Sequence, residues 1–234
     1  MRLLIVVATY NELDNLPALV DRLVELLPSV EIVVVDDDSP DGTWKWVQKK
    51  AEVLPSLKLI HRTKERGLGS ATIAGLKFGL DDDFDFIGTM DADFSHDPAA
   101  ICEMFELAQS GSFDAVVGSR YVRGGRIEGW PLHRRLASRV VNLLARYWLG
   151  LKTHDNTGAL RVYRAEILRK VGLSDIRSAG YAYLEELMMK LQRNKAVVIE
   201  HPITFRDREE GRSKAGLGVG IAVIREILMM RFQK

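Results

Sequence analysis

Apolar residues along the first half of the chain alternate between two spacings. Continuous apolar runs of strand length cover residues 2–8, 31–35, 57–61, 84–90 and 113–118. Between these runs, apolar residues recur every three or four positions, the period of a helix, over residues 16–27, 43–54, 68–80 and 98–109. Because the runs are rich in Val, Ile and Leu, they are typical of strands buried on both faces, as in a parallel sheet. The alternation predicts an α/β fold with a mostly parallel, Rossmann-like sheet flanked by helices.

After about residue 120 the pattern changes. A glycine-rich loop at 123–126 precedes a predicted basic amphipathic helix from His133 to Leu149. Further apolar runs predict two short strands, at residues 159–163 and 196–199. Helical spacing predicts two more helices, at about 181–193 and about 217–233. No linker, internal repeat or low-complexity tract interrupts the sequence, so we predict one domain spanning residues 1–234.

The composition is that of a globular protein, since 47% of the 234 residues are hydrophobic. The formal net charge of +1 gives no reason to expect a nucleic acid partner. The single cysteine, Cys102, permits no internal disulfide and suits a reducing compartment. The chain begins with a predicted strand rather than a signal peptide, and no apolar run approaches the roughly 20 residues that span a bilayer. We therefore expect a cytoplasmic protein without a transmembrane segment.

Three predicted strands end in acidic or turn-forming residues. The first run leads into Thr9-Tyr10-Asn11-Glu12, the second into Asp36-Asp37-Asp38, and the fourth into Asp91-Ala92-Asp93. In open α/β sheets, ligands bind outside the carboxyl ends of the strands. The three strand ends therefore predict one shared crevice.

The spacing of Asp91 and Asp93 indicates a metal site. In extended backbone, residues two apart point to the same side, so both carboxylates can converge on one point. A hard divalent cation held there would be completed by water and phosphate oxygens, as in nucleoside diphosphate sites. A solvated turn is the alternative interpretation.

Other common sites are missing from the sequence. The first strand is followed by no G-x-G-x-x-G, and no G-x-x-x-x-G-K-[ST] loop is present, which disfavours a dinucleotide fold and a nucleotidyltransferase. Gly67-Leu68-Gly69 opens a predicted helix and reads as turn chemistry. No H-E-x-x-H or paired C-x-x-C occurs, which argues against zinc.

Five segments together resemble the dolichyl- or polyprenyl-phosphate mannose synthases, which are inverting GT-A glycosyltransferases of family 2. They are Thr9-Tyr10-Asn11-Glu12, Val33 to Thr43 with its D-D-D-S-P-D-G-T string, Met90-Asp91-Ala92-Asp93, Gly118-Ser119-Arg120-Tyr121, and Asp207 to Lys214. The resemblance extends to about residue 216. It implies the GT-A fold and transfer of mannose from GDP-mannose to a membrane polyprenyl or dolichyl phosphate, using Mg²⁺ or Mn²⁺.

The resemblance also implies roles for individual residues. Tyr10 and Glu12 correspond to residues that hold the nucleoside, and Val35 and Asp37 to residues beside the base and ribose. Ala8 stands where the family usually has proline, which loosens the turn without removing a ligand.

The metal and the phosphates are assigned in the same way. Asp91, Ala92 and Asp93 correspond to the metal and diphosphate site, and Arg120, Arg208 and Lys214 to basic residues that receive phosphate charge. Relatives often have an amide side chain at the position of Ser95, so a metal role for Ser95 is not assigned.

Residues on the acceptor side leave alternatives open. The resemblance places Asp155 to Arg164 and Gly180 to Glu186 beside the acceptor, but Arg161 and Arg164 are equally explained as surface pairs flanking a strand. His96, at a helix entry, could touch the donor, but a histidine at such a position is more commonly structural and is not assigned to the site. The helix at 133–149 and the C-terminal helix either lie on a membrane or pack on the core.

Other functions also remain open. The same machinery could use UDP-glucose or a saccharide acceptor, or the chain could be an inactive nucleotide-binding or membrane adaptor protein. The oligomeric state does not follow from the sequence.

Overall fold

A computed structural model describes residues 1–178, 180–207 and 217–231. Within these residues a central sheet contains seven strands: β1 (Leu3–Thr9), β2 (Glu31–Asp36), β3 (Leu57–His61), β4 (Phe86–Met90), β5 (Ala115–Ser119), β7 (Arg161–Arg164) and β8 (Val198–Pro202). Their order is β3-β2-β1-β4-β7-β5-β8. All neighbouring pairs are parallel except those of β7, which runs antiparallel to both β4 and β5. The predicted, mostly parallel sheet is confirmed.

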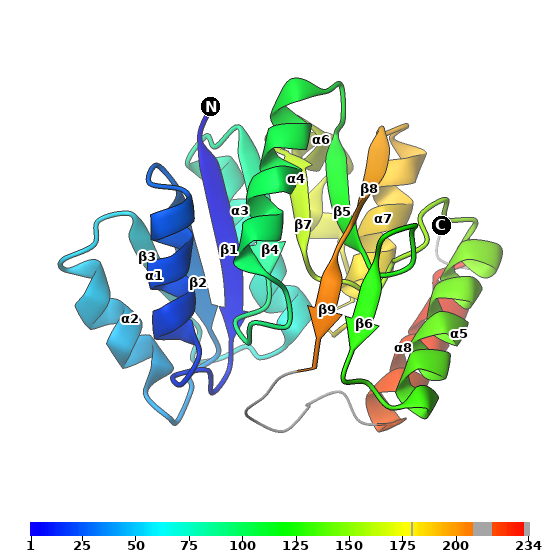
Figure 1. The fold of residues 1–234 in the computed structure, drawn as a ribbon, viewed down its shortest axis with the longest axis horizontal. Helices are drawn as coiled ribbons and strands as arrows, with labels where there is room; N and C mark the ends of the chain where they lie inside the picture. Colours follow the sequence, from blue (N-terminus) through cyan, green and yellow to red (C-terminus); the bar gives the residue numbers. More distant parts are fainter. Residues whose placement is uncertain (179, 208–216, 232–234) are drawn as a thin grey trace.

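Helices cover both faces of this sheet (Figure 1). They are α1 (Leu16–Leu26), α2 (Thr43–Ala51), α3 (Leu68–Asp81), α4 (Pro98–Ser110), α5 (Leu132–Leu149), α6 (Ala165–Val171), α7 (Tyr183–Arg193) and α8 (Leu217–Met230), with a short 3₁₀ helix η1 (Leu173–Asp175). Two further strands, β6 (Arg126–Glu128) and β9 (Thr204–Arg206), form a small parallel sheet beside the end of β8.

Alternation along the strands divides the core into two layers. On β1, Leu4 and Val6 pack in the layer that contains α3, α6 and α7, while Ile5 and Val7 pack in the layer that contains α1 and α4. Gly75 lets α3 lie close to the sheet, because a Cβ at this position would overlap Val6. The sheet is therefore buried on both faces, which explains its continuous apolar runs.

The smallest elements differ from the prediction. β6 and β9 have three residues each, too few to carry a period of two, and α6 follows β7 with no intervening loop. The direction of β7 was also not predicted, because an apolar run does not encode its direction.

The helices α5 and α8 pack against each other at one edge of the molecule (Figure 1). Among the described helices, none combines the length and apolar character needed to cross a bilayer.

Candidate active site

One cavity of about 390 Å³ opens at the carboxyl ends of β1, β2 and β4. It is lined by Ala8, Thr9, Tyr10, Glu12, Asp37, Arg66, Gly67, Leu68, Ala71, Asp91, Ala92, Asp93 and Tyr181. The crevice predicted from three acidic strand ends is therefore present. The structure brings together seven of the predicted site residues, namely Ala8, Tyr10, Glu12, Asp37, Asp91, Ala92 and Asp93.

A buried aspartate fixes the turns that shape the cavity. Asp36 is fully buried and accepts hydrogen bonds from the hydroxyl groups of Thr9 at 2.7 Å and Ser39 at 2.6 Å. The backbone N–H of Glu12 donates to the hydroxyl of Thr43 at 3.1 Å. These contacts join the end of β1 to the end of β2, so the residues after the two strands line the same space.

Asp37 is held by a segment that the sequence analysis did not assign to the site. Arg62 Nε donates to Asp37 Oδ1 at 2.6 Å, and the Gly67 N–H donates to Asp37 Oδ2 at 2.7 Å. The Arg66 guanidinium carbon lies 5.4 Å from the centroid of the Tyr10 ring, within reach of a cation–π contact. Arg66, Gly67 and Leu68 thus line one side of the cavity, although the sequence analysis interpreted the glycines of this segment as part of a turn.

The acidic pair sits in a tight turn after β4. Asp91 and Asp93 both line the cavity, and Asp91 is the more exposed, at 34% of its side chain. Phe94 adopts a left-handed backbone with φ of 54°, and the Ser95 N–H donates to Asp93 Oδ1 at 3.0 Å. His96 Nε2 lies 3.3 Å from Asp91 Oδ2.

This donor set fits a hard divalent cation. Carboxylate oxygens are the ligands that Mg²⁺ and Mn²⁺ prefer, and both carboxylates face one cavity. Within residues 1–178, 180–207 and 217–231, no group of three or more His, Cys, Asp or Glu side chains could hold a metal by itself. A cation at Asp91 and Asp93 would therefore need further oxygen ligands, which a diphosphate supplies.

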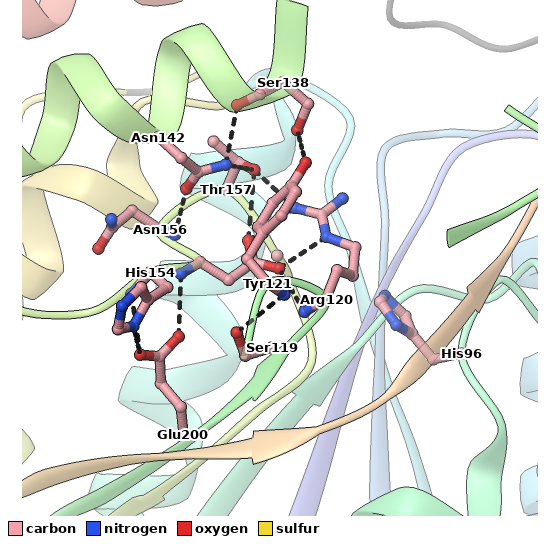
Figure 2. Close-up of polar contacts among 12 residues, drawn as sticks. His96, Ser119, Arg120, Tyr121, Ser138, Asn142, His154, Asn156, Thr157 and Glu200 are labelled. Atoms are coloured by element: carbon pink, nitrogen blue, oxygen red, sulfur yellow. Dashed lines mark hydrogen bonds and ion pairs between the residues drawn. The ribbon is translucent and has the colours of Figure 1, made fainter. Parts of the chain in front are cut away.

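Arg120 does not line this cavity but forms a buried ion pair beside it (Figure 2). Its Nε and Nη2 donate to the two carboxylate oxygens of Asp155, each at 2.7 Å, and Nη2 also donates to Thr157 Oγ1 at 2.6 Å. Burial opposes the charge on both groups, but the contact with Asp155 outweighs it and raises the pKa of Arg120. For the same reason, the pKa of Asp155 lies below its ordinary value. Both groups are therefore ionised.

Further hydrogen bonds tie the Asp155 loop to α5 and β8, and the end of β5 to α5 (Figure 2). Asn142 Oδ1 on α5 accepts the Asn156 N–H at 2.6 Å, and Glu200 Oε1 on β8 accepts the Asp155 N–H at 3.0 Å. Tyr121, after β5, donates its hydroxyl to Ser138 on α5 at 2.7 Å. The network fixes α5 relative to the strand ends.

Three other predicted residues lie outside the cavity lining or outside the described residues. Val35 is fully buried and packs against α3 near Gly75. Arg208 and Lys214 lie outside the described residues, so their roles stay predictions.

The suggested surface pairing of Arg161 and Arg164 is wrong. Arg161 is fully buried and donates to the carbonyls of Asn156 at 2.7 Å and Gly158 at 2.9 Å. Arg164 donates to the carbonyl of Ala108 at 3.1 Å. Both guanidinium groups satisfy backbone carbonyls, which explains arginine at these positions without an acidic partner.

The outer face of α5 carries an exposed apolar stripe. Its members recur at helical spacing and are 48–80% exposed: Leu132, Leu136, Val140, Leu143 and Tyr147. Leu228 and Met229 of the neighbouring α8 are also exposed. Exposed apolar patches on folded proteins are a common feature of interaction sites.

Sequence comparison identifies the family to which this fold belongs. The profile of glycosyl transferase family 2 matches residues 4–172. The chain belongs to this family, and it is therefore a glycosyltransferase.

Curated relatives narrow the similarity. The chain is 41% identical over 225 residues to an undecaprenyl-phosphate mannosyltransferase of Micrococcus luteus, covering 96% of this chain and 92% of the relative. It is 41% identical over 214 residues to a polyprenol monophosphomannose synthase of Mycolicibacterium smegmatis, covering 91% and 80%. A dolichol-phosphate mannosyltransferase of Pyrococcus furiosus is 39% identical over 218 residues, covering 92% of this chain and 59% of the relative.

Solved structures share the fold. A glucosyl-3-phosphoglycerate synthase of Mycobacterium tuberculosis, in complex with Mn²⁺, UDP and glucosyl-3-phosphoglycerate, has a TM-score of 0.72 at 17% identity, covering 98% of this chain and 79% of that chain. A mannosyltransferase of Pyrobaculum calidifontis, in complex with GDP-Man and Mn²⁺, has a TM-score of 0.60 at 17% identity, covering 98% and 69%. The GT-A prediction is confirmed at the level of the fold.

Proposed function

We propose that this chain transfers mannose from GDP-mannose to a polyprenyl or dolichyl phosphate, with inversion at the anomeric carbon. The observation that carries the proposal is the single cavity in which Tyr10, Glu12 and Asp37 face the acidic pair Asp91 and Asp93. The identity of 41% to two polyprenyl-phosphate mannose transferases supports the same reaction. All 234 residues act as one catalytic domain in this proposal.

The donor lies along the cavity from β2 to β4. Tyr10 and Glu12 hold the nucleoside, with Ala8 at the base of the turn. Asp37 is the polar group beside the base and ribose. Arg62 and Gly67 donate to its two carboxylate oxygens and fix the side chain in one orientation. The nucleoside end of the donor is thus bound by rigid, preorganised groups.

Asp91 and Asp93, with Ala92 between them, hold Mg²⁺ or Mn²⁺ against the donor diphosphate. When bound, the cation supplies positive charge that offsets the repulsion between the carboxylates and the diphosphate and stabilises the departing GDP. Arg208 and Lys214 are proposed to contact the phosphates directly. Arg120 is proposed to act on the phosphates from its buried position beside the cavity, as its pKa also responds to the charge of Asp91.

The acceptor needs no catalytic base. A phosphate monoester has a second pKa of about 6, so it is mostly dianionic at neutral pH and can attack the anomeric carbon directly. The protein then acts by positioning two anions and by stabilising the leaving group. Accordingly, no single carboxylate-to-amide change outside the metal site should abolish turnover, and a pH profile that assigns a catalytic base to one acid would contradict the mechanism.

The exposed apolar stripe of α5 is proposed to lie on the membrane that holds the acceptor. Arg139 is exposed on the same helix, and Arg231, which directly follows α8, packs over Trp148 of α5. Apolar residues flanked by cations are the pattern of a helix that lies in an anionic lipid interface. Attachment is therefore peripheral and uses α5 and α8 together, at the cytoplasmic face.

Radiolabelled donors test the proposal. Purified protein is incubated with Mn²⁺, a short polyprenyl phosphate, and either GDP-mannose or UDP-glucose. The expected result is label in the organic phase from GDP-mannose alone. Organic-phase label from UDP-glucose, label in a saccharide, or no transfer would each overturn the proposal in favour of a glucosyltransferase, a saccharide transferase or an inactive adaptor, respectively.

A matched pair of variants tests the metal site. Asp93→Ala should reduce metal-dependent turnover by roughly 10²–10³, the scale of losing one electrostatic contact to a developing charge. Asp97→Ala is the control, because Asp97 lies in the same loop but caps α4 by accepting the Ala99 N–H at 2.9 Å. Equal activity of the two variants would contradict a metal at Asp93.

A further inference from the structure

His96 is buried directly behind the acidic pair. Its residue is 1% exposed, and its Nε2 lies 3.3 Å from Asp91 Oδ2. The ring packs edge-on against Phe205, with the centroids 5.1 Å apart. The backbone of His96 pairs with Phe205 as an isolated bridge, and the Arg206 N–H donates to the Ser95 carbonyl at 3.0 Å. The imidazole is thus fixed from two sides, by the ring of Phe205 and by its own backbone.

The other ring nitrogen of His96, Nδ1, makes this histidine energetically unfavourable. Nδ1 of His96 is buried without a hydrogen-bond partner among the described residues. An unsatisfied buried acceptor destabilises a fold, and a phenylalanine would fill the same aromatic contact without it. The benefit of a histidine at this position must therefore come from its other nitrogen, Nε2, which contacts Asp91.

The contact with Asp91 determines the role of Nε2 in this hydrogen bond. A carboxylate oxygen only accepts hydrogen bonds, so Nε2 of His96 carries a proton and donates it toward Asp91 Oδ2. A carboxylate has two oxygens, so one can accept the N–H while the other binds an ion.

We propose that His96 is a positioning residue for the metal site, whose Nε2–H holds the Asp91 carboxylate in the orientation that binds a divalent cation. The inference rests on the metal site proposed above. The Asp91 side chain is one-third exposed, and Nε2 of the buried His96 ring contacts its Oδ2 at 3.3 Å. Groups that orient a metal ligand commonly change metal affinity about 10- to 100-fold when removed.

Binding of Mn²⁺ to the full chain tests the proposal without relying on turnover. Electron paramagnetic resonance titrations in the presence of GDP compare the wild type with His96→Phe and His96→Gln. His96→Phe keeps the aromatic contact with Phe205 and removes the donor, so Mn²⁺ affinity should fall about 10-fold or more. His96→Gln supplies an amide N–H near the position of Nε2 and should recover most of the affinity.

The control is His201→Phe. His201 lies on β8, and its Nε2 contacts Glu103 at 2.9 Å instead of the acidic pair. This variant should bind Mn²⁺ like the wild type. Thermal unfolding of His96→Phe should begin no lower than that of the wild type, because the unsatisfied Nδ1 is gone.

Each alternative outcome is decisive. Wild-type affinity in His96→Phe, or an equal loss in His96→Gln and His96→Phe, would overturn the positioning role while leaving the metal site intact. An equal loss in His201→Phe would also overturn it. A wild-type chain that binds no Mn²⁺ with GDP would instead overturn the proposed metal site itself, and with it the role of His96.

Discussion

Removing the charge of Asp155 should destabilise this protein strongly. Asp155 accepts three N–H groups of Arg120, from Nε, Nη2 and the backbone, at 2.7, 2.7 and 2.9 Å. Both side chains are almost fully buried, at 4% exposure for Arg120 and 0% for Asp155. In Asp155→Asn, an amide NH₂ would face Nη2, and the guanidinium would remain buried without a counter-charge.

The expected loss follows from that geometry. Leaving one member of a buried ion pair uncompensated costs about 3–5 kcal/mol of unfolding free energy. For a chain of 234 residues, this corresponds to a fall in Tm of roughly 6–20 °C, since each kcal/mol shifts Tm by about 2–4 °C. Urea unfolding followed by circular dichroism measures the free energy, and calorimetry measures Tm.

A surface ion pair of similar length is the matched control. Lys170 and Glu166 are 2.6 Å apart on α6, with side chains 59% and 67% exposed. Glu166→Gln should leave the unfolding free energy within experimental error, because water screens an exposed pair. The double variant Arg120→Met, Asp155→Leu should lose much less than Asp155→Asn, since it removes both charges.

The pH dependence has a definite sign. The pKa of Asp155 is lower in the folded chain than in the unfolded chain, so its contribution is complete above the unfolded value near 3.9 and is lost as pH falls through the folded value. The difference between the wild type and Asp155→Asn should therefore be constant from about pH 5 upward. A loss no larger than that of Glu166→Gln at pH 7 would refute the reasoning.

Three further predictions concern the core, a buried acid and the surface. Gly75→Ala should lower the unfolding free energy by about 1–3 kcal/mol, because the added Cβ overlaps Val6. Urea unfolding should show no comparable loss for Gly180→Ala, since a Cβ there meets no other atom within 4 Å. Equal losses in the two variants would contradict the close packing of α3 on β1. Burial raises the pKa of Glu185 from 4.5 to about 8, so on raising the pH the unfolded chain loses this proton first and the stability of the fold falls between those two pH values. Glu185→Gln should remove this fall in Tm. An unchanged dependence of Tm on pH in the variant would count against a protonated Glu185. Leu136→Glu should abolish flotation with anionic liposomes while preserving turnover of a short, soluble acceptor, and undiminished flotation would refute docking through α5.

Much of the fold follows from local pattern. The β1, β2 and β4 runs are apolar on both faces, and each ends in polar residues that could only lie at one edge of a parallel sheet. The position of the acidic pair at the cavity was predictable because Asp91 and Asp93 directly follow an apolar strand, whereas their metal role stays a prediction. β6 and β9 were not predicted, because three residues are too few to show the alternation of a strand.

The rest of the site depends on contacts between distant parts of the chain. Arg120 and Asp155 are 35 residues apart, and only the reversed strand β7 brings their loops together. His96 reads from sequence as an ordinary residue at a helix entry, and its approach to Asp91 depends on Phe205, more than 100 residues later. Arg66 and Gly67 reach the cavity only because Asp37 binds their loop. Such pairings leave no trace in local spacing.

The reversed strand also constrains how the chain is made. The strands β3, β2, β1 and β4 can pair with one another once the first 90 residues are available, but β5 has only β7 and β8 as neighbours in the sheet. On the ribosome, β4 and β5 therefore both keep an unpaired side until residues 161–164 emerge. Unpaired strands readily add strands from other chains. Nascent chains stalled before residue 161 should accordingly need a chaperone, and the need should end only after β8 (Val198–Pro202) has emerged and paired with the second side of β5.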